Sequence, residues 1–207
     1  MSSISRSDMI FALYGYDSRL VKVFAQEYHR PCSVVKGIMG HHDHKKAAEE
    51  QKIRCSVLVV SDRHRGSKNT SGPVAESLLE TAGHEVVYSA QVGNDPEEIR
   101  AAIETGLKKA DFLLTIGGTG PSSRDRTVET VRSFLSCELP GFGELFRRKS
   151  EAEIGTAAIL SRALLGVTQD KTALASLPGS EGAVRLGLEE VLLPELKHLI
   201  WDLGRYE

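Results

Sequence analysis

The residues best suited to chemistry lie between positions 115 and 129, where the sequence reads TIGGTGPSSRDRTVE. An apolar run ends there in Gly117, Gly118, Thr119 and Gly120, and a helical pattern begins a few residues later. Glycines allow a sharp turn and let a bulky anion approach main-chain N–H groups, while a nearby helix N-terminus adds positive potential. The loop could therefore hold nucleotide phosphates, although a tight turn from strand to helix uses the same residues. Its spacing matches neither the Walker A motif nor the GxGxxG fingerprint.

Two charged side chains at the end of this loop favour the phosphate interpretation. The guanidinium of Arg124 could neutralise phosphate oxygens. The carboxylate of Asp125 could hold Mg²⁺, which binds oxygen ligands beside nucleotide phosphates. The structural alternative makes Arg124 a solvated surface residue and Asp125 a helix cap, but Thr127 could cap the same helix equally well.

Loops elsewhere in the sequence offer further candidates. The run DPEE at 95–98 is a helix-capping signature, yet it also follows a predicted strand, and a capping and a functional role for Asp95 are compatible. Ser61 and Asp62 end another strand, where Asp62 could bind substrate or a metal, or only shape a turn. Additional residues of the kind that contact anions are Ser161, Arg162, Pro178, Gly179 and Ser180.

These candidates are carried by a chain that alternates β-type and α-type segments from Arg54 onward. Apolar, β-branched runs predict strands at 55–61, 84–92 and 111–116. Apolar periodicity, with Pro or Gly near the ends, predicts helices at 71–82, 94–109 and about 127–136. This order predicts a parallel sheet with helices on both faces, in which ligands bind at the carboxyl ends of the strands. We therefore expect the loops after Ser61, Val92 and Ile116 to meet.

The C-terminal third of the chain completes an α/β domain. The pattern predicts a helix-rich stretch after Pro140 and a hairpin at 164–177 that turns around Gln169 and Asp170. A long helical region follows at 183–203, with a break expected at Pro194. We assign residues 53–207 to this domain and residues 1–52 to an N-terminal extension of unknown role.

The extension has a different pattern. Residues 18–28 could form one amphipathic helix, and we expect Leu20, Val23 and Phe24 to pack against the domain or a neighbouring subunit. Three histidines and an aspartate follow at 41–44. They could chelate a metal, but adjacent ligands seldom converge on one ion, so a solvated linker is the favoured interpretation.

Composition excludes several classes of protein. The chain has 207 residues and a net charge of −2, which argues against a nucleic-acid partner. The cysteines are Cys32, Cys55 and Cys137, an odd number without CxxC spacing, so a reducing compartment fits best. Because no apolar run approaches the roughly 18 residues of a membrane helix, we expect a cytoplasmic protein without a membrane partner.

Several short segments together resemble a known family. They are VVSDR at 59–63, TSG at 70–72, GHEVV at 83–87, GND at 93–95, the loop at 115–129, GFGELFRRKS at 141–150, IGTAAILSRALLG at 154–166 and LPGS at 177–180. In this order they resemble the MoaB/MogA family of molybdenum cofactor biosynthesis proteins, which includes the gephyrin G domain. The resemblance covers about residues 54–204 but not the extension. The LSRALLG and GFGELFR segments resemble the MoaB-like branch.

The resemblance implies a three-layer α/β/α fold, a homotrimer or hexamer, and an Mg²⁺- and ATP-dependent adenylyl transfer to molybdopterin. The terminal phosphate of the pterin would attack the α-phosphorus of ATP, and pyrophosphate would leave. Asp95 and Asp125 match the family's functional carboxylates and would hold Mg²⁺, while Arg124 would neutralise charge in the transition state. The loop at 117–120 would hold nucleotide phosphates. The residues implied on the molybdopterin side are Ser61, Asp62, Ser161, Arg162, Pro178, Gly179 and Ser180.

Small departures from the family pattern leave these groups in place. Val128 and Glu181 stand where proline is frequent, and Asn69 replaces an acidic residue, which weakens any metal role for that loop. Two alternatives remain open. A related nucleotide pyrophosphatase of the competence-damage type would tend to lack Arg124. A non-catalytic molybdopterin-binding or trimeric scaffold protein would bind pterin without turnover.

Overall fold

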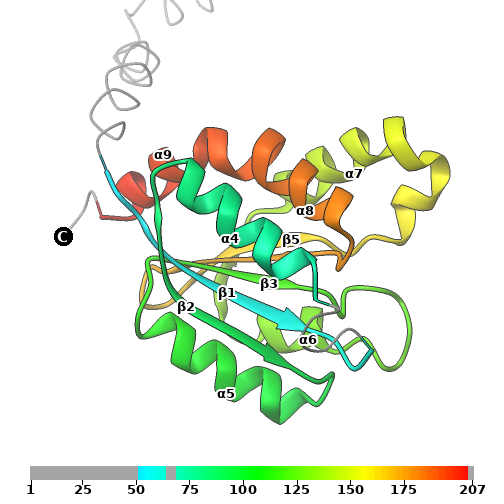
Figure 1. The fold of residues 1–207 in the computed structure, drawn as a ribbon, viewed down its shortest axis with the longest axis horizontal. Helices are drawn as coiled ribbons and strands as arrows, with labels where there is room; N and C mark the ends of the chain where they lie inside the picture. The colour runs from blue at the N-terminus through cyan, green and yellow to red at the C-terminus, as the bar shows by residue number, and fades with distance from the viewer. Residues whose placement is uncertain (1–50, 64–68, 205–207) are drawn as a thin grey trace, which may run out of the picture. The chain divides into compact units, whose positions relative to one another are not determined.

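A six-stranded sheet forms the centre of the computed structural model, which describes residues 51–63 and 69–204 (Figure 1). In spatial order the strands are β2 (Glu85–Val92), β1 (Arg54–Val60), β3 (Phe112–Ile116), β6 (Ala173–Leu177), β5 (Leu164–Thr168) and β4 (Leu135–Glu138). The first four are mutually parallel, and β5 is antiparallel to both of its neighbours. The prediction of a mostly parallel α/β sheet is therefore confirmed.

Helices cover both faces of the sheet and make the fold three-layered (Figure 1). One face carries α5 (Pro96–Leu107) and α6 (Thr127–Arg132). The other carries α4 (Ser71–Thr81), α7 (Pro140–Ile154), α8 (Glu181–Gly187) and α9 (Leu193–Gly204). A 3₁₀ segment, η2 (Gly155–Leu160), continues α7, and a π-helical segment, η3 (Leu188–Leu192), joins α8 to α9.

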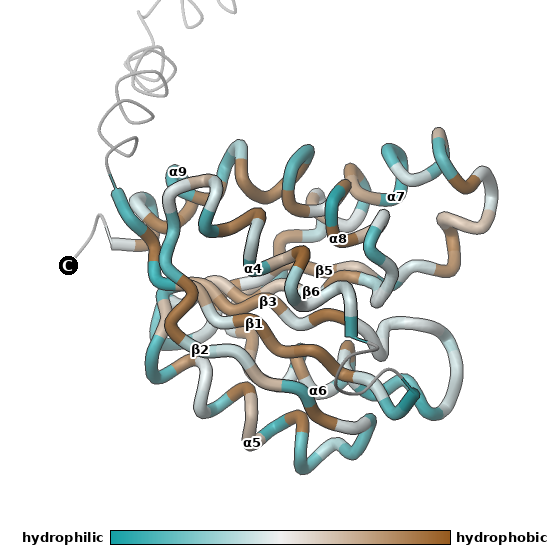
Figure 2. Tube along the Cα trace, in the orientation of Figure 1, coloured by the Kyte–Doolittle hydropathy of each residue, from teal (hydrophilic) through white to brown (hydrophobic). Residues whose placement is uncertain are grey.

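Strand β1 shows why the sequence adopts this arrangement. Val57 and Val59 pack into the core beneath α4 and α7, and Leu58 and Val60 pack into the core beneath α5. A strand buried on both faces needs a continuous apolar run rather than an alternating one, and Figure 2 shows such apolar runs in the central strands. Burial also raises the pKa of the Cys55 thiol in this strand to about 12, with a further contribution from the charge of Asp111. Cys55 is therefore a core residue.

The sequence pattern did not predict strand β4, because it predicted a helix as far as position 136. In the structure that helix, α6, ends at Arg132. The next residues form a short edge strand in which Cys137 pairs with Val167 of β5. This strand is largely exposed and has no long apolar run, so only its pairing with β5 marks it. The predicted hairpin at 164–177 is confirmed as β5 and β6.

The break expected at Pro194 was also wrong. Pro194 is the second residue of α9, and the π-helical turns of Leu188–Leu192 precede it. Proline lacks an N–H group and crowds the preceding turn, and a wider turn before it accommodates both effects without ending the helix. The predictions for residues 18–28 and 41–44 lie outside the described residues. Within the part that is described, no helix has the length and apolar character needed to cross a membrane.

Candidate active site

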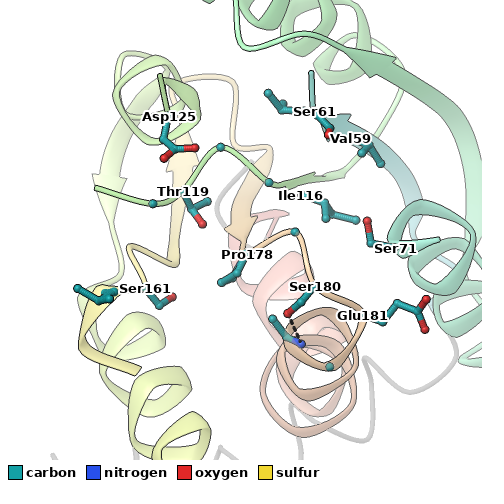
Figure 3. A pocket seen from close by; sticks show the side chains of 18 of the residues that line it. Val59, Ser61, Ser71, Ile116, Thr119, Asp125, Ser161, Pro178, Ser180 and Glu181 are labelled. Carbon is teal, nitrogen blue, oxygen red and sulfur yellow. Dashed lines mark hydrogen bonds between the residues drawn. The ribbon is translucent and has the colours of Figure 1, made fainter. Parts of the chain in front are cut away.

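A cleft of about 1170 Å³ opens at the carboxyl ends of the parallel strands (Figure 3). The loops that follow β1, β3 and β6 line it, together with the start of α4 and the α7–η2 segment. All predicted site residues line this cleft except Asp95 and Arg162. Those in the cleft are Ser61, Asp62, Gly117, Gly118, Thr119, Gly120, Arg124, Asp125, Ser161, Pro178, Gly179 and Ser180.

The glycine loop is pressed against two neighbouring strands. Gly117 has a φ of +94°, and a Cβ atom there would lie 2.4 Å from the backbone oxygen of Val60. The N–H of Gly117 donates to the carbonyl of Leu177 at 2.9 Å. Gly118 is also left-handed, with a φ of +63°. Glycine at 117 is therefore required both by the turn and by the close approach of β1.

Asp125 lies over the same loop. A Cβ atom on Gly120 would lie 2.8 Å from Asp125 Oδ2, so the carboxylate occupies the space that the missing side chain leaves. Among the described residues, no group donates a hydrogen bond to this carboxylate. Figure 3 shows Asp125 beside the loop segment that carries Thr119. Asp125 is thus open to a cation or to a substrate hydroxyl.

Both capping interpretations for α6 were wrong. The helix begins at Thr127 and has no side-chain cap, so Asp125 is not its cap and Thr127 is already inside the helix. The N–H of Thr127 donates to the carbonyl of Gly118 at 3.2 Å. The hydroxyl of Thr127 and Oδ1 of Asn94 are buried without a hydrogen-bond partner in the structure described. A Cβ atom on Gly118 would lie within 2.8 Å of both oxygens, so both crowd this glycine.

Asp95 does cap α5, as its sequence context predicted. Its Oδ1 accepts from the N–H groups of Glu97 and Glu98 at 2.9 and 3.1 Å. Glu98 bonds the N–H of Gly93 instead of closing the capping box on Asp95. Asp95 lies in a shallower hollow beside the cleft, and Arg124 lines both. The two predicted carboxylates therefore line neighbouring spaces rather than one.

Asp62 holds two loops together while it lines the cleft. Its two carboxylate oxygens accept from the main-chain N and from Nδ2 of Asn94, at 2.9 and 3.1 Å. These bonds connect the loop after β1 to the loop after β2. Asn94 belongs to the GND segment, but nothing in that pattern indicated its contact with Asp62.

The opposite wall comes from the connections after η2 and β6. The hydroxyl of Ser180 caps α8 by accepting from the N–H of Ala183 at 3.3 Å. Ser161 Oγ accepts from the N–H of Ala163 at 3.3 Å, and the carbonyl of Ser161 accepts from Arg147. Sequence reasoning missed the contribution of α7 and η2, because only tertiary packing brings them to the cleft. Those missed lining residues are Phe146, Ser150, Glu153, Ile154, Ala157 and Leu160.

Arg162 directs its guanidinium to the glycine loop. Nε donates to the carbonyl of Thr119 at 3.1 Å, and Nη2 donates to the carbonyl of Asp125 at 3.2 Å. Nη1 forms an ion pair with Glu129. Burial acts to raise the pKa of Glu129, but the hydrogen bond and charge of Arg162, with smaller contributions nearby, hold it below its ordinary value. Each guanidinium nitrogen of Arg162 is therefore engaged.

The described part of the chain holds no cluster of metal-ligating side chains. Within residues 51–63 and 69–204, no three His, Cys, Asp or Glu side chains gather closely enough to hold an ion.

In an open α/β sheet ligands bind at the carboxyl ends of the parallel strands, so a glycine loop and a cleft at this edge define a ligand-binding α/β protein. The family model described as a probable molybdopterin binding domain matches residues 56–198. The chain belongs to this family, and its relatives are molybdenum cofactor biosynthesis proteins of the MoaB/MogA type.

Individual relatives show the extent of the similarity. Molybdenum cofactor biosynthesis protein B of Bacillus cereus is 43% identical over 166 residues, which cover 79% of this chain and 97% of that protein. A crystal structure of a molybdenum cofactor biosynthesis protein B aligns with a TM-score of 0.71 and 42% identity, over 75% of this chain and 98% of the other. The tungsten cofactor synthesizing protein MoaB from Pyrococcus furiosus aligns with a TM-score of 0.69 and 35% identity, over 74% and 98%.

Proposed function

We propose that this chain acts in molybdenum cofactor biosynthesis as a molybdopterin adenylyltransferase, which transfers the adenylyl group of ATP to the terminal phosphate of molybdopterin and releases pyrophosphate. The observation that supports this most directly is the single cleft at the carboxyl edge of the sheet. It is lined by the glycine loop, by Arg124 and Asp125, and by the segments at 161 and 178–180. The same cleft thus contains residues that could bind ATP and residues that could bind molybdopterin.

The residues divide between the two substrates. The loop at 117–120 would hold the phosphates of ATP through the main-chain N–H groups of residues 118–120, since the N–H of Gly117 already donates to the carbonyl of Leu177. Ser161 and the segment 178–180 line the opposite wall and would contact the pterin side, with Ser61 and Asp62 at the β1 end. An oxygen of the pterin phosphate would attack the α-phosphorus, and the bond to the pyrophosphate oxygen would break. Arg124 would neutralise charge that spreads over the phosphoryl oxygens in the transition state.

Mg²⁺ fits the residues present at Asp125. The carboxylate of Asp125 lines the cleft and accepts no hydrogen bond from the described residues, whereas one oxygen of Asp95 already caps α5. Asp125 would therefore be the main protein ligand, and Asp95 would act from the neighbouring hollow. When bound, Mg²⁺ would offset the negative charge of the ATP phosphates.

We also propose that the protein is a homo-oligomer, a trimer or hexamer, in the cytoplasm. Three large apolar side chains of α7 and η2 are exposed in the chain by itself: Ile159, which lies outside the cleft, and Ile154 and Leu160, which also line it. Exposed apolar groups of this size favour contact with another subunit.

The test mixes purified protein with molybdopterin, ATP and Mg²⁺, and compares the wild type with Asp125→Asn. Mass spectrometry detects adenylylated molybdopterin, and a coupled assay measures pyrophosphate. We expect product from the wild type and a loss of at least about 100-fold in Asp125→Asn. Asp170→Asn serves as the matched control, because Asp170 is an exposed aspartate in the turn between β5 and β6.

Other outcomes would replace the proposal. Molybdopterin binding without product would identify a binding or scaffold protein. Hydrolysis of a nucleotide diphosphate compound such as ADP-ribose, without transfer to the pterin, would identify a pyrophosphatase. An equal loss in Asp170→Asn would show that the effect of Asp125→Asn is not specific to the cleft.

A further inference from the structure

Arg162 occupies an unusual place among the candidate site residues. It follows Ser161, which lines the cleft, but Arg162 itself does not line it. Its side chain is 30% exposed, and its guanidinium reaches across to the segment between β3 and α6. The resemblance to the family implied a contact with molybdopterin, and the hydrogen bonds point elsewhere.

The two main-chain acceptors of Arg162 bracket the reactive part of the loop. Thr119 O lies before residues 120–124, and Asp125 O lies after them. One planar group therefore fixes both ends of the segment that carries Arg124 and leads into Asp125. A guanidinium can do this because its donors lie in a rigid plane, whereas the ammonium of lysine is a point donor on a flexible stem.

Glu129 completes this arrangement from the first turns of α6. Its carboxylate pairs with Nη1 of Arg162, so the third donor of the guanidinium is also fixed. On the other side, Arg147 of α7 donates to the carbonyl of Ser161 at 3.3 Å. The segment that carries Arg162 is thus itself held by α7. The cleft's two walls are joined through this one side chain.

We infer that Arg162, paired with Glu129, is a positioning residue that holds the loop at 119–125 in the geometry needed for the reaction, and is not a ligand of molybdopterin. This inference rests on the adenylyl transfer proposed above. It concerns where Arg124 and Asp125 are held, because displacing catalytic groups by about 1 Å can cost as much as 100-fold in rate.

The test uses the conservative variants Arg162→Lys and Glu129→Gln and their double variant. For Arg162→Lys we expect kcat to fall by about 10- to 100-fold, with the KM for molybdopterin and its dissociation constant changed by less than about threefold. We expect Glu129→Gln to show a smaller fall in kcat. The double variant should be no worse than Arg162→Lys, because both changes remove one interaction.

A second readout does not depend on turnover. Amide hydrogen exchange in residues 118–126 should accelerate by at least about tenfold in Arg162→Lys, because two charge-assisted hydrogen bonds that restrain the loop are lost. The matched control is Arg132→Lys, since Arg132 lies on the same helix as Glu129 but donates its hydrogen bonds to Glu138 of β4 and not to the loop. That control should leave both kcat and the exchange of 118–126 unchanged.

Each outcome decides one question. A dissociation constant for molybdopterin that rises by tenfold or more in Arg162→Lys, with loop exchange unchanged, would overturn the inference and restore Arg162 as a ligand. Faster loop exchange in a protein whose wild type makes no product would leave the positioning of the loop established and refute the transferase. A lower melting temperature alone, with unchanged kcat, would reduce Arg162 to a purely structural residue.

Discussion

The two ends of the parallel sheet are built on different principles. At the amino ends, four hydrogen bonds between Arg54 and Asp111 join β1 to the approach to β3. The N–H and two guanidinium nitrogens of Arg54 donate to the Asp111 carboxylate, the shortest at 2.7 Å, and the N–H of Asp111 donates to the carbonyl of Arg54. At the carboxyl ends, the chain turns through left-handed glycines, and the side-chain oxygens of Asn94 and Thr127 are buried without a hydrogen-bond partner among the described residues.

This difference separates what stabilises the fold from what could act on a ligand. At the amino end the charges of Arg54 and Asp111 satisfy each other. At the carboxyl end the carboxylate of Asp125 accepts no hydrogen bond from the described residues, and Arg162 uses its donors to hold a loop. Unsatisfied polar groups and strained turns of this kind concentrate where a protein binds or reacts. Substitutions at the carboxyl end should therefore lower activity, and substitutions at the amino end should lower stability and leave activity unchanged.

The largest effect should come from Gly117→Ala, with Gly83→Ala at the other end as its partner. A Cβ atom at 117 would lie 2.4 Å from the main-chain oxygen of Val60, so the loop must move. We expect the rate of pyrophosphate release to fall by about 100-fold. Gly83 has a φ of +86°, but a Cβ atom there meets nothing within 4 Å. Gly83→Ala should cost about 1 kcal/mol of unfolding free energy and leave kcat unchanged.

The measurement pairs steady-state pyrophosphate release with urea unfolding for each variant. Gly141→Ala is a second control, because a Cβ atom there also meets open space and Gly141 has no positive φ. A Gly83→Ala protein with the same loss of kcat as Gly117→Ala would break the distinction between the two ends.

An intermediate effect is expected at the amino end from Asp111→Asn. Burial acts to raise the pKa of Asp111, but the hydrogen bonds and charge of Arg54 outweigh it and hold the pKa below 3.8. A carboxyl group whose pKa is lower in the folded state stabilises the protein above its unfolded value, and that contribution is lost as pH falls through the folded value. At pH 7 we expect Asp111→Asn to cost about 1 kcal/mol, since the pair is partly exposed.

The check is the unfolding free energy of wild type and Asp111→Asn over pH 3 to 7. The difference between them should be full at pH 7 and should shrink below pH 3.8, while kcat stays unchanged at pH 7. A difference independent of pH would show that the charge of Asp111 contributes nothing and that only packing was altered.

The sequence predicted the central strands well because burial on both faces leaves a plain signal. Strands β1 and β3 are mostly apolar, with the runs VLVV at 57–60 and FLL at 112–114, and α5 carries its capping signature at Asp95. Strand β4 has neither signal, so the sequence pattern predicted a helix as far as position 136, which overlaps the start of β4. Pro194 was misjudged for a related reason, since a π-helical turn is a response to packing that no local propensity specifies.

For the candidate site, the sequence predicted which loops would line the cleft, but not the contacts between them. The rule that ligands bind at the carboxyl ends of parallel strands predicted that the loops after β1, β2 and β3 would meet, and Asp62, Asn94 and Gly117 of these loops do line one cleft. No sequence pattern predicted which groups the side chains of the site contact. Arg162 points to the loop, Asp62 bonds Asn94, and α7 supplies lining residues, because each depends on contacts between segments distant in sequence.

The smallest effect concerns His84, a buried polar side chain at the amino end with an atom that lacks a hydrogen-bond partner among the described residues. His84 is buried near the start of β2, and its Nδ1 lacks a partner among the described residues. Burial, with the charge of Lys197, lowers its pKa from 6.5. Because the unfolded chain then binds a proton more readily than the folded one, stability should be full above pH 6.5 and should decline as pH falls toward the lower folded value. Catalysis should not follow this decline, since His84 lies away from the cleft.

Unfolding free energies of wild type and His84→Leu at pH 7.5 and 5.5 test this exception. The wild type should lose stability between the two values, and His84→Leu should lose less. An equal slope in wild type and His84→Leu would mean that the neutral imidazole at 84 costs nothing to protonate. The buried Nδ1 would then not weaken the amino end of the sheet between pH 7.5 and 5.5, and the contrast with the carboxyl end would be sharper than this atom suggests.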